Sequence, residues 1–252
     1  MFYCYNIFMQ KYIAVVNPKM DDDQISRLIA QDVAGAIFSI SHQNYPLAAK
    51  LIRQVKKLSL KHNRPVSVIQ DATDMLDPLD LEFGIRNGVD WVVVADPKYV
   101  NLARKLNKKM PVIWKGKKLP KNIPVDSIMS ESIDDADATV EGWGQIKHQP
   151  SPHVKQQVLE TIRHIGDQAQ TSAIAVSDLY TAKALSAMRS NQKIVYAPKD
   201  PALAPQGSIF WGVHPVFQQN NLHSHLKNRQ LLKRGDRYLD ARNTKHVTIN
   251  LV

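Results

Sequence analysis

Polar side chains that could bind ions stand at the ends of several apolar stretches. Asp71, Asp74 and Asp77 come just before a predicted helix, where aspartates either hold a cation or, more often, cap the helix. Ser41 and His42 end an earlier apolar stretch, a position at which such residues usually hydrogen-bond to the local backbone.

Lysine and histidine offer further candidates. Lys115 opens a basic loop, and by composition alone it is a surface residue because lysine is rarely buried. His223 and His225, with the basic cluster through Arg242, could form a weak metal or phosphate patch. Two histidines separated by one residue, without a carboxylate or cysteine partner, make a poor site, so we predict a solvated surface and no metal site. The single cysteine, Cys4, excludes a disulfide and a Cys-based zinc site.

The net charge of +10 suggests a partner that carries phosphate. The basic residues of 47–64 fall among apolar residues at helical spacing, which is typical of a solvated helix face; they are Lys50, Arg53, Lys56, Lys57, Lys61 and Arg64. No zinc pattern, RNP-type aromatic motif or helix-turn-helix accompanies them, so we do not expect a nucleic-acid partner, whereas a small phosphorylated ligand stays open. With no apolar run of about 20 residues and one cysteine, we expect no membrane partner and a cytoplasmic location.

Apolar, β-branched runs alternate with amphipathic stretches from residue 11 onward, which predicts an α/β fold with a mainly parallel sheet covered by helices. The predicted strands are 12–17, 36–40, 65–70, 91–95, 111–114 and, more weakly, 137–140, with helices at 21–31, 45–62, 78–87 and 97–108. We expect 115–135 to be a long irregular connection. Later elements are a helix at 152–165, strands at 173–176, 193–197 and 246–251, a helix at 178–189 and a short helix after Asp200.

A change of composition at 148–152 (HQPSP) predicts a linker. We therefore divide the chain into an N-terminal extension (1–10), a first α/β domain (11–150) and a second, smaller α/β domain (151–252).

The stretch DLEFGIRNGVDWVVVADPK at 80–98 resembles the segment of pyruvate kinases that follows the lid domain. Other stretches follow in the order of that family: KYIAVVNP (11–18), AIFSISH (36–42), PVSVIQDA (65–72), ADATVEG (136–142), AIAVSDLYTAKALSAMR (173–189), WGVHPVF (211–217) and KRGDRYL (233–239). The resemblance implies an incomplete TIM-type (β/α) barrel over 11–150, without the lid insertion, followed by a pyruvate kinase C-terminal-like domain.

Pyruvate kinases transfer a phosphoryl group from phosphoenolpyruvate to ADP with Mg²⁺ and K⁺, and most of the catalysis is charge placement. By resemblance, Lys115 matches the catalytic lysine, Lys98, Ser41 and His42 match substrate- or phosphate-binding positions, and Ser39, Ser41 and Asp71 match ligands of the monovalent cation. Other positions differ from the family: Ile37 replaces a phosphate-binding arginine, Ala72 a threonine and Lys117 a metal-binding glutamate, and the second metal-binding aspartate has no counterpart.

The resemblance implies a pyruvate kinase-like protein of glycolytic type with impaired catalysis, acting as a binding or regulatory paralogue. It would assemble as a homo-oligomer or with a full-length pyruvate kinase. Mg²⁺ and K⁺ are implied only by the family. Two alternatives stay open: an active phosphotransferase with rearranged metal ligands, and a basic protein that binds a phosphate ligand or nucleic acid.

Overall fold

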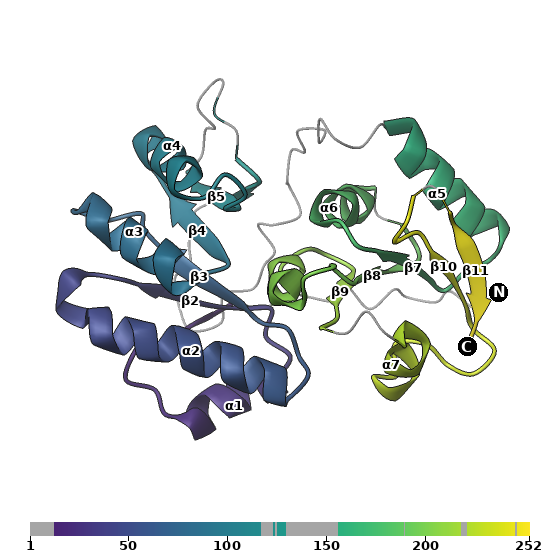
Figure 1. Cartoon of the computed structure of the whole chain (residues 1–252), viewed down its shortest axis with the longest axis horizontal. Coiled ribbons are helices and arrows are strands. Elements are labelled where there is room, and N and C mark those ends of the chain that lie inside the picture. The colour runs from purple at the N-terminus through teal and green to yellow at the C-terminus, as the bar shows by residue number, and fades with distance from the viewer. Residues whose placement is uncertain are drawn as a thin grey trace, which may run out of the picture.

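A computed structural model describes residues 13–116, 123, 125–129, 156–188, 190–217, 221–244 and 246–252. These residues form two β-sheets with helices packed against them (Figure 1). The predicted α/β class, with parallel strands and helices, is confirmed. The predicted extension at 1–10, the strand at 137–140 and the linker at 148–152 lie outside the described residues.

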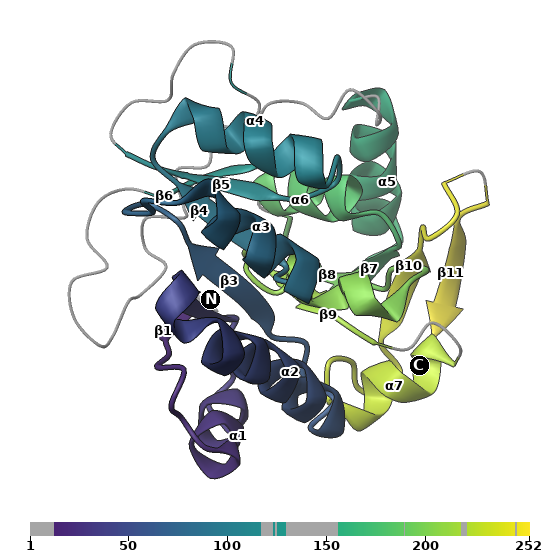
Figure 2. The same cartoon turned by 60° about the vertical axis from the view of Figure 1, so that its left-hand side comes forward.

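The first sheet has six parallel strands in the order of the sequence: β1 (Ile13–Val15), β2 (Gly35–Ser39), β3 (Ser67–Asp71), β4 (Trp91–Val94), β5 (Val112–Lys115) and β6 (Ser127–Met129). The connections contain α1 (Asp22–Ala30), a short 3-10 helix η1 (His42–Asn44), α2 (Tyr45–Lys61), α3 (Pro78–Asn87) and α4 (Pro97–Leu106). Parallel crossovers are right-handed, so consecutive neighbours place every connecting helix on one face of the sheet. Figures 1 and 2 show α1 to α4 along that face.

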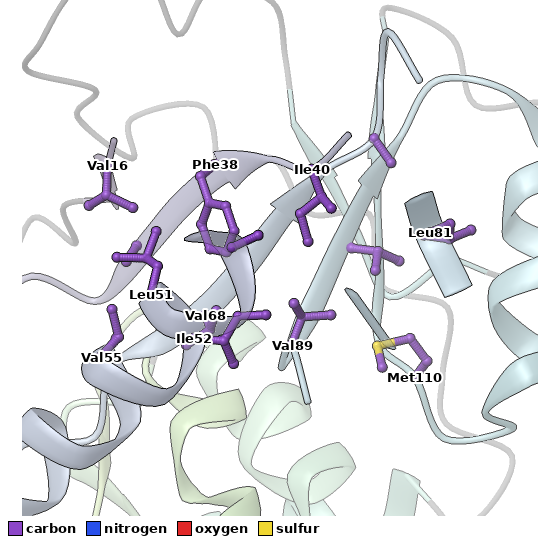
Figure 3. Packing of buried hydrophobic residues seen from close by; sticks show 14 of the residues in the cluster. Val16, Phe38, Ile40, Leu51, Ile52, Val55, Val68, Leu81, Val89 and Met110 are labelled. Atoms are coloured by element: carbon purple, nitrogen blue, oxygen red, sulfur yellow. The ribbon is translucent and has the colours of Figure 1, made fainter. Parts of the chain in front are cut away.

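The spacing of apolar residues determines how these helices pack on the sheet. In α2, Leu51, Ile52 and Val55 lie on one side of the helix and are buried. Alternate strand residues such as Phe38 and Val68 project toward them, and Figure 3 shows this cluster from close by. The predicted helical periodicity therefore corresponds to the face that packs on the sheet.

Local capping residues fix the ends of α3. The Asp77 carboxylate accepts a hydrogen bond from the Leu79 N–H at 2.9 Å, and Pro78 occupies the first helical position. Gly88 ends the helix with φ of 90°, a left-handed conformation that favours glycine. These three positions were predicted to begin and end this helix, and the structure confirms them.

The second sheet has the strand order β11-β10-β7-β8-β9. Its strands are β7 (Ala173–Val176), β8 (Lys193–Tyr196), β9 (Val213–Pro215), β10 (Arg237–Asp240) and β11 (Thr248–Leu251), and only β11 runs antiparallel to its neighbour. The helices of this part are α5 (Gln156–Gln168), α6 (Leu179–Ala187), the 3-10 helix η3 (Pro201–Gly207) and α7 (Leu222–Asn228).

One buried cluster joins the two sheets, because the face of the first sheet opposite its helices packs against the second part of the chain. Trp91 of β4 meets Phe210 edge to face, with ring centroids 5.6 Å apart, and its indole N–H donates to the Gln206 carbonyl at 3.2 Å. The Ser67 hydroxyl donates to the Pro205 carbonyl at 2.5 Å. The sheets therefore share a core, and we call it the shared core.

The predicted irregular connection over 115–135 is wrong at 127–129, where β6 pairs with β5. Contacts of the preceding Asp126 hold this short strand: its carboxylate accepts hydrogen bonds from the Val112 N–H at 2.8 Å and from Arg104 at 2.5 Å. A three-residue strand anchored in this way carries little periodicity of its own. Among the described residues, no helix combines the length and apolar character needed to cross a membrane.

Candidate functional site

Three of the predicted site residues lie on one face at the carboxyl end of the first sheet. Ser39 and Asp71 are register partners on β2 and β3, and Lys115 ends β5. Each stands two residues after an isoleucine of the shared core, namely Ile37, Ile69 and Ile113. Because side chains alternate along a strand, these polar residues face the same side as the shared core. We call this row the strand-end edge.

The described part of the strand-end edge has two charged groups, the Asp71 carboxylate and the Lys115 ammonium. The Asp71 carboxylate accepts hydrogen bonds from the backbone N–H of Thr73 at 3.0 Å and from its hydroxyl at 2.7 Å, which makes a local turn. Lys115 is half-buried and makes no hydrogen bond or ion pair within the part of the chain that the structure describes. One strand separates Asp71 from Lys115, which places their strands roughly 10 Å apart. Asp71 and Lys115 therefore do not form a compact ion pair.

The remaining predicted residues have local roles. The Ser41 N–H donates to Asn44 Oδ1 at 3.0 Å at the start of η1, and His42 is exposed. The Lys98 ammonium lies 3.0 Å from the Asp96 carboxylate and 4.7 Å from the centroid of the Tyr99 ring. The hydrogen bond to Asp96 raises the pKa of Lys98. The carboxylate of Asp96, which caps the start of α4, therefore balances the charge of Lys98.

Two positions where the sequence departs from the pyruvate kinase pattern, Ile37 and Ala72, are buried apolar residues and bring no charge to the strand-end edge. Ile37 is 2% exposed and belongs to the shared core. Lys117 lies outside the described residues. Asp77 caps α3 as predicted, and Asp74 is exposed. Within the described ranges, no group of three or more His, Cys, Asp or Glu side chains is placed to hold a metal ion.

A cavity of about 650 Å³ lies at the opposite, amino-terminal end of β2 and β3, between the two sheets. Figure 2 shows α7 beside the end of α2, and both helices border it. It is lined by Asp32, Val33, Ala34, His62, Asn63, Arg64, Pro65, Lys193, Ser208, His214, Pro215, Asn228, Arg229, Gln230 and Leu231. Asp32, Asn63 and Gln230 follow the ends of α1, α2 and α7 with φ of 65°, 51° and 55°. We call this space the inter-sheet cavity.

Three cations line the inter-sheet cavity, and each donates to the main chain. Arg64 donates to the Ala30 carbonyl at 3.0 Å, Arg229 to the Pro215 carbonyl at 3.0 Å, and Lys193 to the Leu231 carbonyl at 2.7 Å. A guanidinium has five N–H donors, so each arginine keeps donors for a ligand. These cations face one carboxylate, Asp32, which lies 3.5 Å from Arg64. The lining therefore has a positive formal charge.

Burial lowers the pKa of the Arg229 guanidinium; Asp32 opposes this effect and the charge of Arg64 adds to it. Two partly desolvated guanidinium groups thus repel each other across the cavity. The carbonyl ends of the three neighbouring helices offset part of this positive potential. An anion bound between the arginines would relieve their repulsion and use the remaining donors.

The sequence did not reveal this cavity. Arg64 was predicted on the solvated face of a helix, but it lies beyond the end of α2 and binds the last carbonyls of α1, so that prediction is wrong for Arg64. The prediction of a solvated face is also wrong for Lys56, because its ammonium lies 3.2 Å from the buried carboxylate of Asp90. The cavity residues come from distant segments, and their shared location needs the tertiary structure.

The predicted solvated surface at the two histidines is wrong for His225, which is 5% exposed. His223, on the same helix, is exposed as predicted. Burial lowers the pKa of His225 from its ordinary 6.5, and the charge of Arg229 lowers it further. Burial and the nearby Arg229 therefore favour the neutral form of His225 at neutral pH.

We expect His225→Gln to reduce the loss of stability on acidification. Because the pKa of His225 is depressed in the native state, the unfolded chain binds this proton at a higher pH. The contribution of His225 to the free energy of unfolding is complete above about pH 6.5. It is lost as the pH falls, by at most about 1.4 kcal/mol per pH unit. Denaturant unfolding between pH 7.5 and 5 measures this slope. His223→Gln is the control, and equal slopes for both variants would contradict the prediction.

A comparison with models of known protein families finds no match, and a comparison with curated proteins finds none. Function is therefore inferred from the chemistry of the two candidate sites. The strand-end edge offers one unpaired lysine among the described residues, whereas the inter-sheet cavity gathers three cations around one open-sided hollow. The cavity is the better binding site for an anion.

Proposed function

We propose that this chain is a pyruvate kinase-like protein with impaired catalysis, which binds a small phosphate-bearing ligand in the inter-sheet cavity. The observation that carries the proposal is the uneven distribution of cations. Among the described residues, Arg64, Arg229 and Lys193 line the cavity, while the strand-end edge has Lys115 and a buried isoleucine at position 37.

Several features support the pyruvate kinase-like part of the proposal. Six parallel strands follow one another in sequence order with their helices on one face, which is the arrangement of consecutive strands in a (β/α) barrel. In the described part, β1 and β6 are the edges of the sheet, so we infer an incomplete barrel. Its inner face packs against the second sheet. The open edges are where we place a second copy of the chain or a full-length pyruvate kinase.

The residues at the strand-end edge do not fit a divalent cation. Asp71 contributes one carboxylate, which already accepts two hydrogen bonds from Thr73. Ala72 is buried where the family has a threonine. Ser39, Ser41 and Asp71 offer oxygen atoms of the kind that K⁺ prefers, but no second carboxylate stands beside them on β2 or β4. We therefore derive no catalytic step through Mg²⁺ or K⁺.

A coupled assay of pyruvate formation tests the catalytic part of the proposal. Purified protein is incubated with phosphoenolpyruvate, ADP, K⁺ and either Mg²⁺ or Mn²⁺. We expect no turnover above a buffer control, because among the described residues the strand-end edge has only Lys115 to neutralise the transferring phosphoryl group.

One observation favours the alternative of an active phosphotransferase. Lys115 makes no hydrogen bond or ion pair to the described part of the chain, and it shares the strand-end edge with Asp71. A free lysine at a strand end could bind the transferring phosphoryl group. Turnover by the wild type that is lost in Lys115→Ala would establish this alternative and refute the proposed impairment.

Ligand binding tests the inter-sheet cavity. We expect Arg229→Met to weaken the binding of phosphoenolpyruvate by roughly 10- to 100-fold, because charge-assisted hydrogen bonds contribute about 1.5–3 kcal/mol. Isothermal titration calorimetry at low salt gives the dissociation constants. Arg53→Met is the matched control, since it removes an equal charge from the exposed face of α2. Equal affinities of the two variants would place the ligand elsewhere.

A further inference from the structure

Asp32 is the one carboxylate among the described residues that line the inter-sheet cavity, and it stands at an unusual place for an acid. It follows Gln31, the C-cap of α1, and has φ of 65°. Glycine or asparagine is the usual residue in this left-handed position after a helix. An aspartate there also puts a negative charge at the negative end of the helix dipole. Because local structure does not favour this charge, we looked for its role in the cavity.

The Asp32 carboxylate is held loosely beside Arg64. Its Oδ1 lies 3.5 Å from Arg64 Nη1, its side chain is 82% exposed, and it makes no hydrogen bond to the part of the chain that the structure describes. Exposed ion pairs of this kind contribute little to stability. Arg64 Nη1 is held independently, because it donates to the Ala30 carbonyl at 3.0 Å and lies 3.4 Å from the Ile29 carbonyl. An anion can therefore replace the carboxylate without displacing the guanidinium.

Asp32 also acts on the arginine of the opposite wall. Its charge raises the pKa of Arg229, whereas burial and the charge of Arg64 lower that pKa. The carboxylate therefore lies within electrostatic reach of both guanidinium groups. An anion that binds between Arg64 and Arg229 meets the negative charge of Asp32, and it must either displace this side chain or bind against its repulsion.

We propose that Asp32 is a specificity-determining residue, which competes with the ligand for Arg64 and so keeps simple carboxylates out of the inter-sheet cavity. This inference rests on the proposed function of the cavity. A carboxylate tethered beside its partner acts at an effective concentration of roughly millimolar or more, so a free carboxylate of the same strength does not displace it at lower concentrations. A phosphate group brings a second negative charge and three strong acceptor oxygens, and it binds the arginines in place of Asp32.

Isothermal titration calorimetry of the full chain at low salt and pH 7.5, with inorganic phosphate and with acetate, tests this inference on Asp32→Asn. Asparagine keeps the shape of the side chain and accepts the left-handed backbone, so the variant should be at least as stable as the wild type. We expect it to bind phosphate roughly three- to tenfold more tightly, and to bind acetate more tightly by a similar factor. Asp23→Asn is the matched control, because it removes an equal charge from an exposed position of α1 outside the cavity lining.

The possible results separate this inference from the proposed function. Equal phosphate affinities of the wild type and Asp32→Asn, with weaker binding by Arg229→Met, would overturn the role of Asp32 and leave the cavity as the binding site. An equal gain in Asp23→Asn would also overturn it, because the gain would then come from net charge alone. Absence of phosphate binding by both the wild type and Asp32→Asn would overturn the inference together with the proposed function.

Discussion

Replacing Trp91 with alanine is expected to lower the free energy of unfolding by about 3–5 kcal/mol. Trp91 is the largest fully buried side chain in the part of the chain that the structure describes, and it lies in the shared core that joins the two sheets. The substitution removes its contact with Phe210 and its hydrogen bond to the Gln206 carbonyl, and it leaves a cavity. Denaturant unfolding measured by circular dichroism gives the change.

A matched control is Leu60→Ala, because this α2 side chain is 62% exposed and should cost less than about 0.5 kcal/mol. If the sheets share one core, the wild type should unfold in a single transition. A loss below about 1 kcal/mol for Trp91→Ala would contradict the shared core, since large-to-small changes in packed cores cost more.

Gly207→Ala should destabilise the protein by about 1–3 kcal/mol or more. A Cβ atom at this position would lie 2.4 Å from Cδ1 of Tyr196, whose ring is buried, so the ring or the backbone would have to shift. Gly207 ends η3, and the adjacent Ser208 lines the inter-sheet cavity. We therefore expect weaker ligand binding as well as lower stability.

Gly166→Ala is the matched control for Gly207→Ala. Its added Cβ would be 3.2 Å from the Thr171 hydroxyl, a contact that a small shift relieves, and alanine favours the helical conformation of α5. We expect little change or a gain in the unfolding free energy of this variant. Equal losses for the two variants would show that Tyr196 does not restrict Gly207.

Elements with local signals could be predicted from the sequence. The helix from Pro78 to Asn87 has an aspartate cap, a proline at its first position and a glycine after its end. The helix from Tyr45 to Lys61 has a clear apolar face. β6 could not be found, because its position depends on Asp126 binding Arg104 and Val112 rather than on a pattern of its own.

The two candidate sites also differ in how far the sequence could predict them. Strand ends of a parallel sheet meet at one edge, so Ser39, Asp71 and Lys115 could be expected on the same side. The inter-sheet cavity joins residues that are more than 150 positions apart, such as Arg64 and Arg229. Neither arginine belongs to a motif. Their convergence requires the packing of η3 against β3, which no local pattern indicates.

Hydrogen–deuterium exchange with saturating phosphoenolpyruvate tests most directly where the ligand binds. The proposed site predicts slower exchange in peptides that cover 62–66 and 226–232, where α2 and α7 end at the inter-sheet cavity. Peptides that cover 39–42, 71–73 and 115–116 should be unchanged. Protection of these strand-end peptides instead, or of neither group, would contradict the inter-sheet cavity as the binding site.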